Sequence, residues 1–336
     1  MLRVTTSLFA ALLLLVPATA SAVTLKIATV APDGTVWMQR LRAGAEEVRA
    51  RTDGRVQFKF YGGGVMGDEA SVLRKMRFGQ LQGGAFTGGG AAAMYADVRL
   101  YSLPLLFRDQ TEVDYVRSQI DAEIYAGMED AGFVTFGFAT GGFAMLMSQS
   151  PVQRLSDLDG HKLWVPEGDP VVYDSMRALG LSPVTLPLTD VLTGLQTGLV
   201  DSVGISPLGA VAFQWHTQLQ HVTDYPLVHL IGALIVDKRA FDRIDAADQA
   251  IVREVMGRVY QEFDRDNRRD NVSATAALHD QGLQFHPLTD DVDAWRAQLE
   301  PVFQQLAARG EYSADLYERI QRLLREYRAA QAAAAP

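Results

Sequence analysis

The sequence predicts an α/β protein of two similar lobes that close on each other like a clamshell, with a long helix spanning the hinge. Three observations predict this fold. Strand-like and helix-like segments alternate, their order recurs in the second half, and a long helical pattern with a polar middle follows. The chain has 336 residues. Single cores stop growing at about 250–300 residues, so two domains are expected.

The first 22 residues have the features of a secretory signal peptide. A short positive end at Met1–Arg3 precedes an apolar run from Ser7 to Val16, and Ala20-Ser21-Ala22 supplies a small-residue cleavage site. The apolar run is too short to cross a bilayer as a helix, which needs about 20 residues. We therefore expect cleavage after Ala22 and export of the remaining chain.

Composition and motifs argue against several classes of protein. The formal net charge of −9 would repel nucleic acid phosphates. The chain contains no cysteine and no Gly-x-Ser-x-Gly motif, and its six histidines lack metal-ligand spacing. We therefore expect no enzyme activity, no cofactor and no metal, and stability that comes from packing without disulfides.

The first lobe begins with alternating elements. Strands are predicted at residues 25–30, 56–61 and 85–87, and helices at 37–48 and 70–78. The helices are indicated by apolar residues at helical spacing, and glycine-rich breaks separate the elements. The third strand runs into three consecutive glycines, 88–90. Such alternation is typical of a mostly parallel sheet that helices cover.

The same order returns in the second lobe. Strands are predicted at 163–165, 184–186 and 201–205, with one helix from Pro170 to Gly180 and another that Thr189 caps and Gly198 ends. Any two βαβ units look partly alike, which is the alternative explanation of the recurrence. In open α/β sheets, ligands bind beyond the carboxyl ends of the strands, so two such edges facing each other would form a ligand-binding cleft.

A helix over residues 246–280 would be roughly 50 Å long at 1.5 Å per residue. Its middle, residues 264–270, is polar on every side, which is typical of a helix that bridges domains. Two more helices are expected within 291–330. The predicted boundaries place 23–145 and 230–265 in the first lobe, and 146–229 and 266–330 in the second.

Four motifs carry a resemblance to a known family: residues 103–109 (LPLLFRD), 158–166 (LDGHKLWVP), 178–184 (ALGLSPV) and 194–201 (GLQTGLVD). In this order and spacing, the chain resembles the periplasmic solute-binding subunit of TRAP transporters, the DctP-like family. The resemblance implies a periplasmic-binding-protein clamshell that binds a small molecule without chemical change. It also implies a periplasmic location and delivery to a membrane permease driven by an ion gradient.

The chain departs from that family where acid-binding members carry polar groups. Trp164 stands in place of an arginine on the first strand of the second lobe, and Ala144 stands in place of a second arginine. Ile205-Ser206 replaces an asparagine that often precedes a proline. An unpartnered buried carboxylate costs at least several kcal/mol, roughly a tenfold loss of affinity for each 1.4 kcal/mol. The departures predict a ligand with substantial apolar or aromatic surface.

The predicted ligand-binding residues combine these positions with their neighbours: Trp164, Phe143, Ala144, Met145, Trp37, Glu69, Gly89, Ile205, Ser206 and Trp215. The aromatic residues and Met145 could instead be core, and Glu69 could instead stabilise a helix N-terminus. Lys162 shares a strand face with Trp164 and could meet an anion.

Two other functions stay open. The protein could bind a carboxylate through a non-standard cation, or it could be a ligand sensor that presents its closed form to a signalling receptor. Relatives that lack the arginine also suggest a helical-repeat periplasmic partner.

Overall fold

The computed structural model describes residues 22–334. The strands are β1 Val23–Thr29, β2 Val56–Tyr61, β3 Gly83–Thr87, β4 Phe133–Ser148, β5 Trp164–Pro166, β6 Val184–Leu186, β7 Ser202–Ile205, β8 His221–Asp237 and β9 Gln284–Pro287. The helices are α1 Val36–Arg51, α2 Glu69–Arg77, α3 Gly88–Ala92, α4 Gln110–Asp130, α5 Pro170–Ala178, α6 Val191–Thr197, α7 Pro207–Ala212, α8 Lys238–Phe241, α9 Ala246–Asp280, α10 Val292–Ala308 and α11 Ala314–Ala334. Four short 3₁₀ helices are η1 Ala96–Ser102, η2 Leu155–Leu158, η3 Leu188–Asp190 and η4 Trp215–Gln218.

The strands form two lobes of the same design. In lobe I, which carries β1–β3, strand β1 pairs in parallel with β2 and β3, and β3 pairs antiparallel with β8. In lobe II, which carries β5–β7, strand β5 pairs in parallel with β6. A parallel bridge between Leu163 and Ser202 links β5 to β7, and β7 pairs antiparallel with β4. This arrangement confirms the predicted two-lobed α/β fold.

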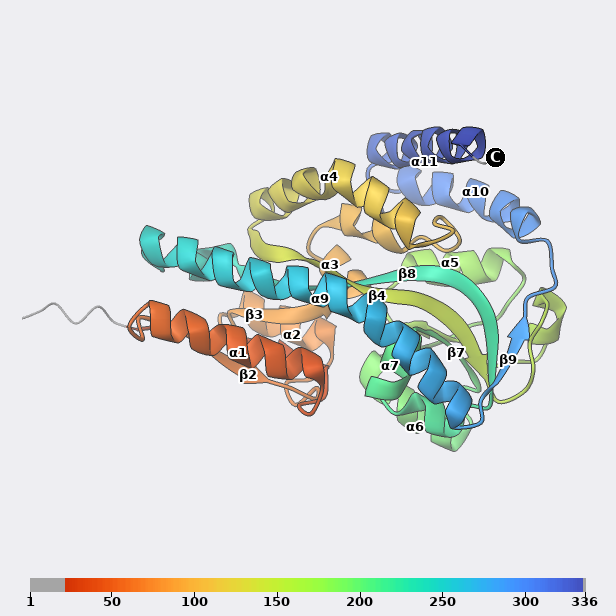
Figure 1. The fold of residues 1–336 in the computed structure, drawn as a ribbon, viewed down its shortest axis with the longest axis horizontal. Coiled ribbons are helices and arrows are strands. Elements are labelled where there is room, and N and C mark those ends of the chain that lie inside the picture. The colour runs from red at the N-terminus through yellow and green to blue at the C-terminus, as the bar shows by residue number, and fades with distance from the viewer. Residues whose placement is uncertain (1–21, 335–336) are drawn as a thin grey trace, which may run out of the picture.

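Two long strands connect the lobes. Strands β4 and β8 have 16 and 17 residues and pair antiparallel along their lengths, with register shifts between Thr140 and Gly142 and between Ala144 and Leu146. One end of the pair lies beside β3 and the other beside β7, and Figure 1 shows both strands curving from one lobe into the other. The shifts lie close to residue 145, where a lobe boundary is predicted. We retain the predicted boundaries as a proposal.

Helix α9 has the bounds that the sequence predicts, Ala246–Asp280. Its N-terminal apolar stripe packs in the lobe I core, and Leu278 near its other end packs in the lobe II core. Figure 1 shows it running beside α1 and on across lobe II. The polar middle bonds to the connecting strands, since Asp264 accepts from Thr140 N at 2.8 Å and Asn267 donates to Thr140 O at 2.8 Å.

The last two helices contact elements of both lobes. Helix α10 packs against α5, and α11 packs against α10 and α4. Arg328 on α11 donates to the buried carboxylate of Glu112 on α4 at 2.7 Å. Within residues 22–334, no helix combines the length and the hydrophobicity that crossing a bilayer requires. The predicted signal peptide falls almost wholly within residues 1–21, outside the described part of the chain.

One predicted cap is wrong. Thr189 does not cap α6, because the 3₁₀ turn η3 precedes the helix and moves its start to Val191. The Thr189 hydroxyl donates instead to the carboxylate of its neighbour Asp190, at 3.1 Å. The predicted end at Gly198 is correct: this residue has φ 69° and lies in the left-handed region that favours glycine.

Candidate ligand-binding cleft

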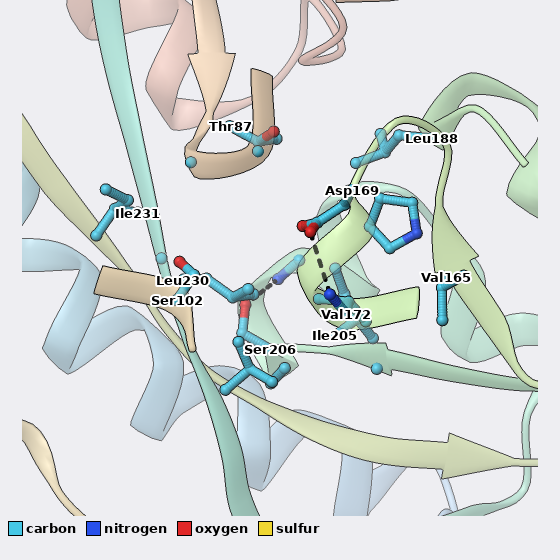
Figure 2. Close-up of a pocket in the computed structure, with 18 of the residues that line it drawn as sticks. Thr87, Ser102, Val165, Asp169, Val172, Leu188, Ile205, Ser206, Leu230 and Ile231 are labelled. Atoms are coloured by element: carbon cyan, nitrogen blue, oxygen red, sulfur yellow. Dashed lines mark hydrogen bonds between the residues drawn. The ribbon is translucent and has the colours of Figure 1, made fainter. Parts of the chain in front are cut away.

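A cavity of about 750 Å³ lies between the lobes. Its wall includes the residues that directly follow four strands: Val30 after β1, Gly88 after β3, Glu167 after β5 and Ser206 after β7. The carboxyl ends of the strands in both lobes therefore face the same space, as expected for ligand sites in open α/β sheets. Figure 2 places Asp169 in this space, between Thr87 of lobe I and Ser206 of lobe II.

The structure brings seven of the ten predicted residues to this cavity: Trp164, Ala144, Trp37, Glu69, Gly89, Ile205 and Ser206. The other three do not line it. Phe143 and Met145 flank Ala144 on β4, and successive side chains of a strand point to opposite faces. Ala144 and Leu146 face the cavity, so Phe143 packs by the His229 ring at 5.5 Å and Met145 packs into the lobe II core. Trp215 is only 1% exposed and belongs to the same core.

Trp164 is both core and cavity wall. Its ring stands edge-on to Trp215, with ring centroids 5.2 Å apart, and it is 5% exposed. Its indole N–H donates to the carbonyl of Leu186 on β6 at 3.0 Å. Because its single donor is used inside the protein, Trp164 offers the cavity an apolar surface and no hydrogen bond.

Trp37 connects the cavity wall to the lobe-crossing elements. Its indole N–H donates to Asn267 Oδ1 on α9 at 3.0 Å, and Asn267 in turn donates to the carbonyl of Thr140 in β4. Asn267 is buried and also lines the cavity. Next along α9, Asn271 donates to Gly141 O at 3.2 Å and accepts from Leu208 N of lobe II at 3.2 Å. One wall residue is therefore hydrogen-bonded to the segment where the strands change lobes.

Two carboxylates from opposite lobes face the cavity. Glu69 accepts from Thr87 N at 2.6 Å and from Thr87 Oγ1 at 2.8 Å. Asp169 caps α5 by accepting from Val171 N and Val172 N, at 3.1 and 3.2 Å, through one carboxylate oxygen. Figure 2 shows the bond to Val172. Burial raises the pKa of both carboxyl groups above their ordinary values.

The three glycines after β3 let these carboxylates approach. A Cβ at Gly90 would collide with the Glu69 carboxylate, and a Cβ at Gly89 would lie 3.5 Å from Asp169 Oδ2. Both carboxylates therefore reach the first turn of α3. Sequence reasoning missed Asp169 as a cavity residue. Its position before Pro170 is a recognisable helix-cap signal, but the direction in which α5 points comes only from the fold.

Side chains of the protein cap the helix N-termini that line the cavity. Thr87, Asp169 and Ser206 line the cavity, and each caps the helix that follows it: Thr87 accepts from Gly90 N, and Ser206 accepts from Gly209 N, both at 3.2 Å. Asp68, also in the wall, caps α2 through Ser71 N at 2.7 Å. These caps occupy one or two of the backbone donors at the start of each helix, and fewer donors remain for an anionic ligand.

Basic groups are sparse around this space. Among the described residues of the wall, Arg74 alone is basic; its side chain is exposed and donates to Ser71 Oγ at 2.7 Å. Lys162 does not line the cavity, because its Nζ donates to Gly198 O at 2.7 Å on the exposed side of the strand. Within residues 22–334, no group of three or more His, Asp or Glu side chains is placed to hold a metal ion.

We define two parts of the wall. The polar end consists of Glu69, Thr87, Asp169 and Ser206. The apolar end comes from the segment after β4, from η2 and α5 with their following turns, from the residue after β9, and from α10. Its residues are Val152, Leu155, Leu158, Leu163, Met176, Leu179, Leu181, Leu288, Trp295 and Leu299.

Comparison with known proteins gives the family. Residues 27–309 match the DctP family, described as bacterial extracellular solute-binding protein, family 7. The C4-dicarboxylate-binding periplasmic protein DctP of Rhodobacter capsulatus is 24% identical over 89% of this chain and 90% of its own length.

Solved structures share the fold. A TRAP periplasmic solute-binding protein from Xanthobacter autotrophicus, with bound β-D-galacturonate, has a TM-score of 0.81 at 21% identity, covering 89% of this chain and 99% of its own. One from Citrobacter koseri, with bound D-glucuronate, has a TM-score of 0.78 at 25% identity, covering 88% and 98%. This chain thus belongs to the DctP family of bacterial extracellular solute-binding proteins, and it is a TRAP transporter solute-binding protein, not an enzyme.

Proposed function

We propose that this protein captures a ligand with substantial apolar or aromatic surface and delivers it to the permease of its TRAP transporter. One observation carries the proposal. Trp164 stands where acid-binding relatives are expected to carry arginine, and its only donor is bonded to Leu186 O. The wall there offers a ring face, which suits hydrocarbon or aromatic surface and cannot pair with a carboxylate.

The remaining wall supports the same conclusion. An ionised ligand that loses its hydration without gaining a partner costs at least several kcal/mol, which is roughly three decades of affinity. The helix N-termini at the cavity are capped by the protein's own side chains, and two carboxylates already face the space. A further carboxylate brought by the ligand would add repulsion.

The relatives favour a different ligand class. The solved structures named above contain hexuronates, and the Rhodobacter relative is named for C4-dicarboxylates. A carboxylate would need a cation from an unusual position in this chain, and Arg74 is the lining residue that could supply it. Its exposure and its bond to Ser71 argue against that role.

A thermal-shift panel on the purified mature protein tests the proposal. Succinate, malate and D-glucuronate form one arm, and apolar and aromatic compounds of similar size form the other. We expect stabilisation in the second arm only. A clear shift with any of the three acids contradicts the proposal. Loss of that shift in Arg74→Ala would then identify the non-standard cation.

Export and partners complete the proposal. We infer cleavage after Ala22, which amino-terminal sequencing of the exported protein tests: a mature chain that begins at Val23 is expected, and another start would be contradictory. The helical-repeat periplasmic partner that the resemblance suggests stays a prediction. Co-purification from the periplasm of the native host, with the permease subunits as the positive control, would test it.

A further inference from the structure

The cavity runs along one face of α5. The wall includes Asp169, Val172, Met176 and Leu179, whose spacing of three and four residues places them on a single side of a helix. From Asp169 to Leu179 this face is roughly 15 Å long at 1.5 Å per residue. The polar end therefore lies at the start of α5, and the apolar end lies toward its last turn.

The start of α5 has an acceptor without a protein partner. Asp169 uses Oδ1 for both of its cap bonds, whereas Oδ2 makes no hydrogen bond to any described residue. Asp169 is partly exposed and belongs to the cavity wall. A partly desolvated carboxylate oxygen without a protein donor is stabilised by a donor from a ligand in the cavity.

Lobe I places a second carboxylate at the same end. Each Glu69 oxygen accepts one bond from Thr87 and keeps a free lone pair. Glu69 and Asp169 approach adjacent residues of the triglycine turn, Gly90 and Gly89. A ligand group held at this turn would therefore meet one carboxylate from each lobe, so that binding would favour the closed clamshell.

The protein compensates these charges only in part. Arg99 lies close enough to Asp169 to oppose the rise in its pKa, but the Arg99 guanidinium pairs with Glu311 at 3.3 Å, and the Glu311 charge acts on Asp169 in the opposite direction. The neighbour whose charge acts on Glu69 is another acid, Asp68. Among the described residues, Arg99 is thus the cation that acts on Asp169, and it shares its charge with Glu311.

The apolar end offers mostly hydrocarbon and aromatic surface. Trp295 and Leu299 lie one turn apart on α10 and face Met176 and Leu179 of α5 across the packed pair of helices. Leu158, Leu163 and Leu181 complete this part of the wall, and each is less than 9% exposed. No charged side chain belongs to it among the described residues.

We propose that the ligand is an amphiphile with a cationic nitrogen, such as a protonated amine, held between Glu69 and Asp169, and a hydrocarbon body lying along α5 against Trp164 and the apolar end. This inference rests on the proposed function and adds the sign of the head group. An ammonium group supplies donors only, so it satisfies Asp169 Oδ2 and both lone pairs on Glu69.

The test compares three probes that share one chain and differ in the head group: decylammonium, decanol and decanoate. Their binding to the mature protein is followed at pH 7, below micelle-forming concentrations, by calorimetry and by tryptophan fluorescence, since Trp37, Trp164 and Trp295 line the cavity. We expect decylammonium to bind at least tenfold more tightly than decanoate, with decanol between them.

A matched pair of variants locates the effect. Asp169→Asn keeps the cap acceptor and the shape but removes the charge, and it should reduce the preference for decylammonium over decanoate about tenfold. Asp174→Asn changes another carboxylate of α5, one that pairs with Arg309 outside the cavity, and should leave the preference unchanged.

The outcomes separate the two proposals. Equal affinity for the three probes, or tighter binding of decanoate, overturns the cationic head group and leaves the apolar-ligand proposal in place. Binding of none of the probes overturns the inference. Stabilisation by D-glucuronate in that case also overturns the proposed function. An equal effect of the two variants contradicts the assignment of Asp169.

Discussion

The two ends of the cavity are built in different ways. Each side chain of the polar end is fixed by bonds to backbone N–H groups, as Glu69 is by Thr87 N and Asp169 is by Val171 N and Val172 N. The apolar end is lined by side chains that contact one another by packing, although elements that carry them are also hydrogen-bonded to one another, as α10 is to α5 through Gln298 and Ala178 O. Hydrogen bonds fix atoms and select chemistry, whereas packing accepts related shapes. On our proposal, the polar end therefore selects the kind of ligand, and the apolar end contributes most to the affinity.

Trp164→Ala should have the largest effect on stability, because Trp164 joins the cavity wall to the lobe II core. Removing a buried indole should lower the free energy of unfolding by about 3–5 kcal/mol. Trp295→Ala, at a partly exposed site of the apolar end, should cost less. Urea denaturation of both variants measures this order. Equal losses would contradict the assignment of Trp164, but not Trp295, to a buried core.

Acid should destabilise the protein through His229, which lies outside both ends. Burial lowers the pKa of His229 to about 3, from an ordinary value of 6.5. Between pH 6.5 and pH 3, the imidazole is therefore protonated in the unfolded chain and neutral in the folded chain. The stability that is present above pH 6.5 is lost as the pH falls toward 3. A loss of a few kcal/mol over this range is expected.

Denaturation at pH 7 and pH 4 measures this acid effect. His229→Gln should be less stable at pH 7, because the ring bonds to Thr140 Oγ1 and Tyr101 O at 3.0 and 3.2 Å are lost or weakened. It should also lose less stability between the two pH values. The same decline in the variant would show that another group is responsible.

Asn267→Leu tests whether the position of Trp37 in the cavity wall depends on its hydrogen bond to Asn267. The substitution leaves the Trp37 N–H and the Thr140 carbonyl without their partner, at a cost of roughly 1–3 kcal/mol for each buried group. We expect lower stability and a changed fluorescence of Trp37 in the empty protein. A variant with unchanged stability would mean that water replaces both bonds.

Asp169→Asn should have the smallest effect on the stability of the protein without ligand, and it should stabilise where the other substitutions destabilise. Because burial raises the pKa of this carboxyl group in the folded chain, the folded chain holds the proton more strongly than the unfolded chain does. The stability that comes from this proton is lost as the pH rises from the ordinary value of 3.8 through the raised pKa of the folded state. The variant removes this penalty at pH 7, so its melting temperature should be slightly higher than that of the unaltered protein. The difference should vanish below the ordinary Asp value of 3.8.

A lower melting temperature of Asp169→Asn at pH 7 would contradict this explanation and assign Asp169 a stabilising ion pair with Arg99. Asp174→Asn is again the matched control. It removes an exposed pair with Arg309, which is expected to change stability by less than about 1 kcal/mol.

The sequence predicted local elements well where turn signals are clear. Residues 56–61, 184–186 and 246–280 have the expected bounds because glycine, proline or cap residues frame them. Phe143 and Met145 were predicted together with Ala144, with core as their alternative, although successive side chains of a strand alternate between faces. Which face meets the cavity could not be counted from the sequence, because β4 shifts register on both sides of Ala144.

The site itself depends on tertiary contacts that no local pattern contains. Trp164 was predicted from a resemblance, but its bond to Leu186 O depends on the pairing of β5 with β6. Asp169 has a visible cap signal, yet its place in the cavity depends on how α5 packs against α10. The apolar end combines the segment after β4 with a helix more than a hundred residues later, which periodicity alone cannot bring together.

The most direct measurement is mass spectrometry of whatever small molecule stays bound after gentle purification of the protein from its native periplasm. We expect a molecule with a large hydrocarbon or aromatic portion and no free carboxylate. Recovery of a hexuronate or a C4-dicarboxylate in stoichiometric amount would contradict it.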